Sequence, residues 1–173
     1  FADRNNLRIT PPHAVCSSAG TLDHPMREKI ERVFGCKVFN HYGSREVHSI
    51  AAECDAFDGL HISALTHLVE VVDELAQPCP DGTEGHIVVT SLTNFAMPFI
   101  RYKIGDLGMM SCKTSCSCGR SLPMLEAVIG RIVDSFRTKD NRVIPGEYFI
   151  HLLGVVLNKD VFGKLQVIQE DYD

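Results

Sequence analysis

The chain has 173 residues, of which 45% are hydrophobic, 23% charged and 8% aromatic, the composition of an ordinary globular protein. This composition excludes a disordered or collagen-like chain. No stretch approaches the roughly 20 consecutive apolar residues of a membrane-spanning helix, and no secretory signal opens the sequence. The formal charge of -5 comes without a basic run, which argues against nucleic-acid binding. We therefore expect a cytoplasmic protein with neither a membrane span nor a nucleic-acid partner.

The two ends of the sequence predict that the chain is a piece of a larger protein. Phe1 opens without an initiator Met, and the strand-like run 164–170 lies where no following segment could pair with it. Parts of a functional site are then expected to lie outside these residues.

The first predicted elements are a turn, a helix and a strand. Residues 17–20 have the composition of a turn, and Asp23 is placed to cap a helix that stops at Gly35. Apolar residues recur at helical spacing between these two positions, which predicts that one face of the helix packs inward. A short strand at 37–40 follows, so Tyr42 lies where a strand ends, a common place for ligand-binding loops in layered α/β folds.

The middle of the chain is rich in predicted strands, because apolar and polar residues alternate there. The strand-like segments are 60–64, 68–72, 86–91, 99–102 and 107–110. Gly105 and Asp106 separate the last two segments, which predicts a compact hairpin with its turn at this pair.

The last part of the chain changes in composition between residues 131 and 142, as linkers between domains do. It includes a polar turn at 138–142, and 147–157 follows with the pattern of an amphipathic helix. We predict a large domain at 1–133 and the start of a small domain at 134–173. The predicted fold class is α/β, as a mixed α+β fragment.

Three short motifs could carry chemistry, and the first is Asn-His-Tyr-Gly-Ser-Arg-Glu at residues 40–46. The ring of Tyr42 beside the flexible Gly43 could stack on a base. The carboxylate of Glu46 could contact Mg²⁺, which prefers oxygen ligands and substrate phosphates. The alternative is a surface turn with a solvated Glu.

The second and third motifs offer further polar groups. Asp106 follows a Gly at the end of a predicted strand, where a carboxylate could accept hydrogen bonds from both hydroxyls of a ribose, or simply stabilise the turn. In Gly-Arg-Ile-Val-Asp at 130–134, Arg131 could reach a ribose or phosphate oxygen, and Asp134 could act as a pivot. The alternative for this last motif is a solvated loop.

In this order and spacing the three motifs resemble those of the adenylate-forming superfamily, which includes acyl-CoA ligases. Within this superfamily, the sequence is most similar to the phenylacetate-CoA ligase family. This similarity is carried by the pair of Glu46 with Cys54, by Cys116-Ser-Cys118-Gly-Arg-Ser-Leu-Pro123, and by residues 138–148. The similarity is greatest to its branch of capsular polysaccharide biosynthesis proteins and covers nearly the whole chain. The resemblance implies the distal, strand-rich part of the large AMP-binding domain and the start of the small C-terminal domain.

The resemblance also implies an activity and a role for each motif. ATP and Mg²⁺ activate a small carboxylate as acyl-AMP, and the acyl group then passes to a thiol, usually of coenzyme A, here in capsular polysaccharide biosynthesis. The implied roles are adenine stacking by Tyr42 with Gly43 beside it, a catalytic Mg²⁺ contact by Glu46, ribose binding by Asp106, a nucleotide contact by Arg131 and a hinge at Asp134.

The sequence also departs from this family pattern. The phosphate-binding loop and the small-domain lysine are missing from the chain, so we expect the 173 residues alone to show no ligase turnover. The turn at 138–142 is less rich in Gly than in typical ligases, which leaves open whether coenzyme A is the acceptor. The carboxylate and the oligomeric state are also left open.

Seven cysteines in a chain without a secretory signal favour reduced thiols, with some committed to a metal. Cys116 and Cys118 share one loop, and Cys54 and His61 frame another, so two pairs could form a structural Zn²⁺ site with four ligands. Cys112 could replace one ligand. The alternatives are unligated thiols or a disulfide within the loop. A functional alternative to the ligase is accordingly a zinc-stapled, non-catalytic scaffold or binding module that retains the ligase fold.

Overall fold

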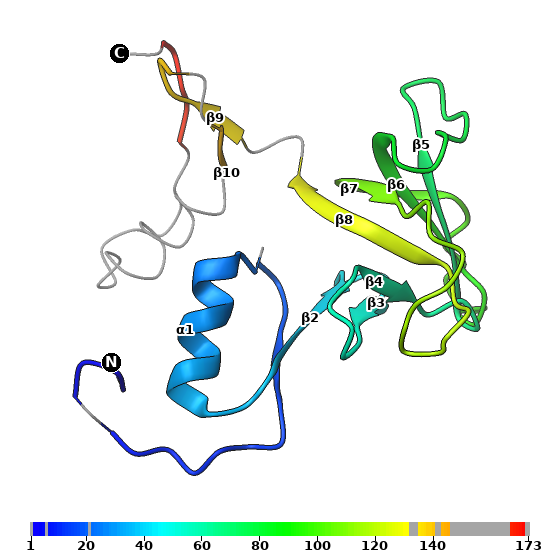
Figure 1. The fold of residues 1–173 in the computed structure, drawn as a ribbon. Coiled ribbons are helices and arrows are strands. Elements are labelled where there is room, and N and C mark those ends of the chain that lie inside the picture. The colour runs from blue at the N-terminus through cyan, green and yellow to red at the C-terminus, as the bar shows by residue number, and fades with distance from the viewer. Residues whose placement is uncertain are drawn as a thin grey trace. The chain divides into compact units, whose positions relative to one another are not determined.

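The computed structural model describes residues 2–5, 7–20, 22–131, 135–140, 143–145 and 167–171. Two compact units divide the chain, Phe1–Ile129 and Gly130–Asp173. The first is built on an eight-stranded sheet and one helix (Figure 1). The strands of this sheet are β1 (Val15–Ser17), β2 (Val38–Gly43), β3 (Ser49–Glu53), β4 (Leu60–Ile62), β5 (His67–Val72), β6 (Glu84–Ser91), β7 (Tyr102–Met110) and β8 (Met124–Arg131).

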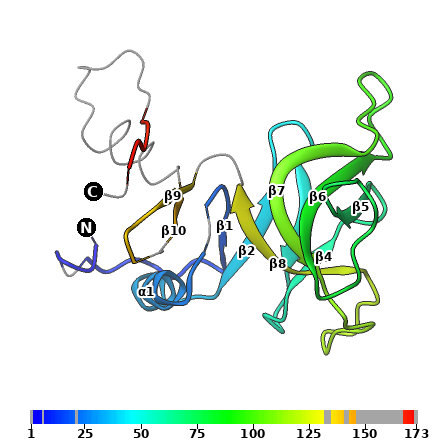
Figure 2. The same ribbon diagram turned by 90° about the horizontal axis from the view of Figure 1, so that it is seen from above.

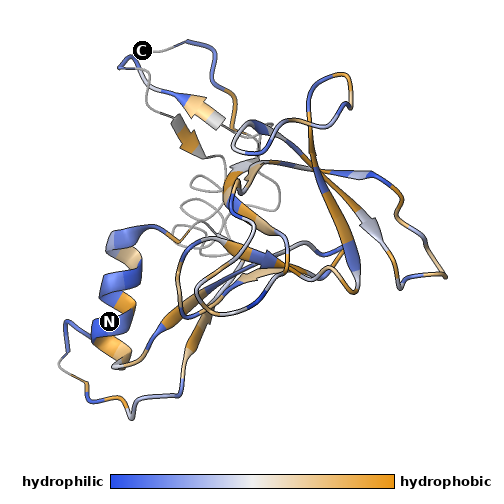
Figure 3. Cartoon of the chain, turned by 45° about the vertical axis from the view of Figure 1, so that its right-hand side comes forward, coloured by the Kyte–Doolittle hydropathy of each residue, from blue (hydrophilic) through white to orange (hydrophobic). Residues whose placement is uncertain are grey.

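Helix α1 (His24–Phe34) has both of its predicted ends. The Asp23 carboxylate accepts a hydrogen bond from the Met26 N–H at 2.7 Å, and Gly35 closes the helix in the left-handed conformation, with φ at 65°. The sequence predicted that one face of α1 packs inward, and the structure shows only partial burial of that face. No residue of α1 is buried and Met26 is 54% exposed, although hydrophobic and hydrophilic colours alternate along the helix (Figure 3).

An ion pair rather than an apolar face anchors α1 to the sheet. The Arg27 guanidinium donates to both carboxylate oxygens of Glu53, at 2.7 and 2.8 Å, and to the carbonyl of Val38. Glu53 also accepts the backbone N–H of Asn40 at 2.7 Å. The same guanidinium lies 5.0 Å from the ring centroid of Phe57. Charge-assisted, two-pronged pairing of this kind fixes the position of the helix against β2 and β3.

The sheet is mixed, with the strand order β1-β2-β3-β4-β8-β7-β6-β5. β1 and β2 are parallel and are joined through α1, as a parallel pair requires a crossover connection. The ladders β2–β3, β3–β4, β4–β8, β5–β6 and β6–β7 are antiparallel. One helix packed on a mixed sheet agrees with the predicted α/β class.

Strands from both halves of the sheet share one hydrophobic core. Figure 2 shows the strong curvature of β6 and β7. The buried members of this core are Val47, Ile50, Ala51, Leu60, Ile62, Val69, Val71, Ile87, Val89, Ile104 and Leu125. Tyr42 of β2 packs against the same cluster. The curl therefore brings β2 and β7 to one core, although β3, β4 and β8 separate them in the strand order.

The predicted hairpin turn at Gly105 and Asp106 is wrong, because β7 runs through both residues without a break. Residues 99–101 precede this strand as loop. The register of β7 against β6 shifts at this point, and the φ of Gly105 is 94°. A Gly with positive φ can be absorbed as a β-bulge within a bent strand as well as in a turn, and the local sequence does not distinguish the two.

Three strands of the eight-stranded sheet have no counterpart in the sequence prediction, namely β1, β3 and β8. Ser17, predicted in a turn, ends β1. β3 and β8 include alanines and charged residues, so their strand pattern is weak. Their strand conformation depends on neighbours that are distant in sequence.

The second unit contains the antiparallel pair β9 (Ser135–Arg137) and β10 (Val143–Pro145) around the predicted polar turn. The predicted helix at 147–157 lies outside the described residues. Of the predicted strand at 164–170, residues 167–170 are described and do not form a strand. Within the described part of the chain, no helix has the length and apolar character needed to cross a bilayer.

Glu53→Ala is expected to lower the free energy of unfolding by about 2–3 kcal/mol, because it leaves the half-buried Arg27 guanidinium without its carboxylate. Glu28→Ala is the matched control. It removes an exposed partner of His24 and should cost less than about 0.5 kcal/mol. Urea denaturation followed by circular dichroism measures both. Equal effects of the two variants would contradict the anchoring role of Glu53.

Candidate functional site

Two of the three sequence motifs meet in the structure. The Tyr42 hydroxyl, at the end of β2, donates a hydrogen bond of 2.7 Å to Oδ2 of Asp106 in β7, 64 residues away in sequence. Asp106 is only 9% exposed, and burying a carboxylate is costly unless it receives hydrogen bonds. The Tyr42 hydroxyl supplies one of these bonds. The side chains of Tyr42 and Asp106 are therefore direct neighbours in the fold.

The turn after Tyr42 is tightly closed. A Cβ on Gly43 would lie 1.9 Å from the carbonyl oxygen of His48, so no side chain fits there. The Ser44 N–H donates to the same carbonyl at 3.2 Å, and the Ser44 hydroxyl accepts the Val47 N–H at 3.0 Å. Glu46 is carried on this turn with an exposed side chain.

His41 connects this turn to the loop that follows β1. Its Nε2 lies 2.8 Å from the hydroxyl of Ser49, and its Nδ1 lies 3.3 Å from the hydroxyl of Ser18. The carboxyl ends of the parallel strands β1 and β2 therefore lie together, which is where layered α/β folds bind ligands. Sequence reasoning missed both serines. No local signal identified Ser18, because the strand that precedes it, β1, has no counterpart in the sequence prediction.

The structure does not describe the side chains of the two predicted site residues in the third motif, the nucleotide contact Arg131 and the hinge Asp134. Arg131 ends β8, but its side chain is outside the described part of the structure, and Asp134 is outside it altogether.

The four predicted metal ligands form a compact group. The ligand atoms of Cys54, His61, Cys116 and Cys118 all lie within 4.8 Å of one another. The two thiol sulfurs of Cys54 and Cys116 are 3.6 Å apart, and the Cys118 sulfur is 3.3 Å from Nε2 of His61. Cys112 is exposed and is not a member of the group. All seven cysteines lie among the described residues and none forms a disulfide.

Other contacts join the two loops that carry this group. Lys113 and Asp58 form an ion pair across the loops at 2.5 Å. Met124 is buried against Cys54 and Cys116. Nδ1 of His61 is buried and has no hydrogen-bond partner among the described residues. A neutral imidazole with its proton on Nδ1 presents the Nε2 lone pair to the three sulfurs, as a metal site requires.

The electrostatics of the thiols differ within the group. A hydrogen bond from the backbone N–H of Arg120, reinforced by its side chain, lowers the pKa of the Cys118 thiol to about 6. Burial raises the pKa of the Cys54 thiol. The group therefore contains one thiol that readily forms the thiolate needed for metal binding, beside a more deeply buried one.

Known proteins are similar to this chain in both sequence and fold. No protein-family model matches the chain. A phenylacetate-coenzyme A ligase of Thermus thermophilus is 33% identical over 134 residues, which is 75% of this chain and 30% of the relative. Protein CapK of Staphylococcus aureus is 27% identical over 172 residues, 98% of this chain and 36% of the relative. The chain belongs to the phenylacetate-CoA ligase-like group of the adenylate-forming superfamily.

A solved structure supports the same assignment. A 2-hydroxyisobutyryl-CoA ligase, crystallised in an open conformation with 2-HIB-AMP and CoA, matches this ligase-like chain with a TM-score of 0.64 and 25% identity. The match covers 82% of the chain and 32% of the solved protein. The chain thus spans about a third of the length of its relatives. The α/β prediction is confirmed, since its mixed sheet and helix match part of such a ligase.

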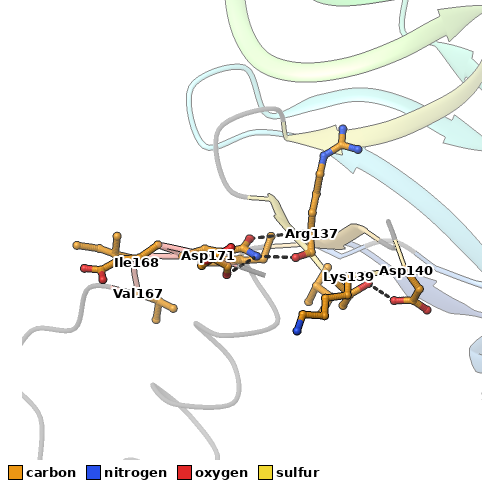
Figure 4. Close-up of a pocket in the computed structure, with 11 residues that line it drawn as sticks. Arg137, Lys139, Asp140, Val167, Ile168 and Asp171 are labelled. Carbon is orange, nitrogen blue, oxygen red and sulfur yellow. Dashed lines mark hydrogen bonds between the residues drawn. The ribbon is translucent and has the colours of Figure 1, made fainter. Parts of the chain in front are cut away.

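A surface groove of about 810 Å³ lies in the second unit of this ligase-like chain, and none of its lining residues is a predicted site residue. Residues 136–140, Ile144 and 167–171 line it (Figure 4). The Gln169 side chain accepts the backbone N–H of Arg137 at 2.8 Å and donates to the Arg137 carbonyl at 2.5 Å. These bonds pair Gln169 with the backbone of β9 much as a neighbouring strand would.

In the metal-free chain, alkylation of Cys118 by iodoacetamide is expected to follow a titration with its midpoint near pH 6. The thiolate is the nucleophile, so the reaction should be fast above this pH and fall as the pH drops through it. Cys54 should react only at alkaline pH, because burial raises its pKa. Peptide-resolved mass spectrometry measures both rates. A Cys118 midpoint above about pH 8, the range of an ordinary thiol, would contradict the Arg120 contact.

Proposed function

We propose that this chain contributes the nucleotide-binding part of an ATP-dependent adenylate-forming ligase. The observation that carries the proposal is the 2.7 Å hydrogen bond between the Tyr42 hydroxyl and Asp106, which unites two motifs from distant parts of the sequence. The relatives named as CoA ligases, and the solved ligase with 2-HIB-AMP and CoA, support the same reaction class.

The proposed reaction has two steps. A carboxylate oxygen attacks the α-phosphorus of ATP, giving acyl-AMP and pyrophosphate, and a thiol then attacks the acyl carbon, giving a thioester and AMP. The Tyr42 ring would stack on the adenine, and the Asp106 carboxylate would accept hydrogen bonds from the ribose hydroxyls. Glu46, exposed on the same turn as Tyr42, would contact the Mg²⁺ that accompanies the phosphates. Positioning and charge stabilisation account for most of the catalysis in such steps.

The domain assignment is part of the same proposal. Residues 1–133 would be the distal part of the large domain, and 134–173 the start of the small domain. Asp134 would be the hinge, and Arg131 a contact to the nucleotide. The division of the chain into compact units near Gly130 supports this assignment. The relatives named as phenylacetate-coenzyme A ligases support coenzyme A as the acceptor. A role in capsular polysaccharide biosynthesis is part of the proposal through the resemblance of the sequence motifs to that branch of the family.

We further propose that Cys54, His61, Cys116 and Cys118 hold one structural Zn²⁺. Zinc binds sulfur at about 2.3 Å and nitrogen at about 2.0–2.1 Å, so in a tetrahedral site two sulfurs lie about 3.8 Å apart and a sulfur and a nitrogen about 3.5 Å apart. The Cys54–Cys116 sulfur separation of 3.6 Å and the separation of 3.3 Å between the Cys118 sulfur and His61 Nε2 are close to these values. Three thiolates and an imidazole are the donors that zinc prefers, and four protein ligands leave no position for a catalytic water.

The ligase proposal is tested by pyrophosphate exchange into ATP, measured with a carboxylate library on the protein expressed from its full reading frame. Exchange should occur only when a suitable carboxylate is present. A protein that retains zinc but neither binds ATP nor catalyses exchange would be the non-catalytic scaffold instead.

In that protein, Asp106→Ala should weaken ATP binding by about 1–3 kcal/mol, the scale of losing charge-assisted hydrogen bonds. Asp81→Ala, at an exposed turn position, is the matched control and should leave the ATP affinity unchanged. Isothermal titration calorimetry measures both. An unchanged affinity in Asp106→Ala would show that this carboxylate does not bind the ribose.

Elemental analysis of the untagged chain should find about one equivalent of zinc, since one group of four ligands is present. The double variant Cys116→Ser/Cys118→Ser should lose it, whereas Cys112→Ser, at an exposed cysteine outside the group, should retain it. Less than about half an equivalent in the unmodified chain, or an unchanged content in the double variant, would disprove the site.

A further inference from the structure

The eight-stranded sheet has a narrow junction at β4. On one side lie β1, β2 and β3, which include Tyr42, and on the other lie β8, β7, β6 and β5, which include Asp106. β4 has three residues and meets β8 at two registered pairs, Leu60 with Leu125 and His61 with Met124. The β5–β6 ladder, by comparison, has six registered pairs. The Tyr42–Asp106 hydrogen bond therefore joins two half-sheets whose connection through the sheet is short.

The four-ligand group spans this junction. Cys54 directly follows β3 and His61 lies in β4, on the side of Tyr42. Cys116 and Cys118 lie between β7 and β8, on the side of Asp106. The cluster thus takes two ligands from each side. A metal bound there would be a crosslink between the half-sheets, beside the short β4–β8 ladder and in addition to the hydrophobic core that both halves share.

The pairing of the strands shows how such a crosslink would reach Tyr42. His61 pairs with Ala52 of β3, which pairs with His41 of β2. Tyr42 is the next residue, and it pairs with Ala51 of the same strand. A shift of β4 against β8 would therefore move Tyr42 as part of a hydrogen-bonded row. Because a hydrogen bond is largely lost beyond about 3.5 Å, a displacement of about 1 Å is enough to separate Tyr42 from Asp106.

We infer that metal bound by Cys54, His61, Cys116 and Cys118 holds the two half-sheets at the spacing at which Tyr42 reaches Asp106, so that the metal centre sets the geometry of the nucleotide site. This inference rests on the proposed metal centre and deepens it, since the metal then does more than order the two loops that bind it. The Asp58–Lys113 ion pair crosses the same junction, but it is half-exposed and contributes little alone.

Hydrogen exchange measured by mass spectrometry on the full chain, zinc-loaded and after chelation, tests the inference. Removing zinc should speed exchange at residues 53–62 and 111–124, which surround the ligands. It should also speed exchange by about tenfold or more at β2 and at residues 104–107 of β7, which contain Tyr42 and Asp106, as expected for local opening. The β5–β6 ladder should remain protected and serves as the internal reference.

Two controls separate this inference from the proposals it rests on. A Cys112→Ser chain should behave like the unmodified one, and Cys116→Ser/Cys118→Ser should show the chelated pattern without chelator. If the double variant fails to fold, stepwise zinc addition to the chelated, unmodified chain carries the test. A chain that binds no zinc would disprove the metal centre itself.

Two results would overturn the inference while leaving the metal centre intact. Faster exchange confined to the two ligand loops would show that the zinc acts only locally. Equal loss of protection in β5–β6 would show that zinc supports the whole fold rather than this junction. As a second readout, in the protein expressed from its full reading frame, zinc removal should weaken ATP binding by about tenfold and have little further effect in Asp106→Ala.

Discussion

The need to satisfy a buried carboxylate is the constraint that organises this structure. Asp106 is buried in β7 close to the core residue Ile104, and a buried carboxylate requires hydrogen-bond donors. One donor comes from Tyr42, which reaches it because the sheet curls around a single core. The bulge at Gly105 and the closed turn at Gly43 are the local features that allow the two side chains to meet. The Tyr42–Asp106 hydrogen bond thus forms where the backbone departs from regular strand geometry.

Polar contacts perform much of the long-range positioning in this chain. α1 has no buried residue and is fixed by Arg27 and Glu53 instead. The loops around Cys54 and Cys116 are joined by contacts between the thiols and the His61 imidazole, by Asp58 with Lys113, and by a small apolar contact to Met124. Charged and metal-ligating groups have directional geometry, so a few of them can fix a spacing that a small apolar contact leaves loose.

The relationship to phenylacetate-CoA ligases and CapK gives these features a common setting. The chain spans about a third of the length of those proteins, and its described residues include the turn after Tyr42, the bulged strand of Asp106 and the cysteine loops. If the metal centre sets the distance between two parts of the nucleotide site, the cysteines and the ligase motifs form one functional unit. That view links two sets of residues that have no connection in the sequence.

The sequence by itself determined the helix ends, the family and the four Cys and His residues that the fold gathers into one group. These depend on residues that act locally or keep a recognisable spacing, such as Asp23 and Gly35 at the ends of α1 or the Cys-x-Cys pair in its loop. The tertiary structure alone decided that Gly105 bends a strand rather than ending one, because a positive φ fits a turn and a bulge equally well. It also decided that β1, β3 and β8 are strands and that Tyr42 meets Asp106. Strand pairing and the curl of a sheet depend on contacts between distant residues, which no local pattern records.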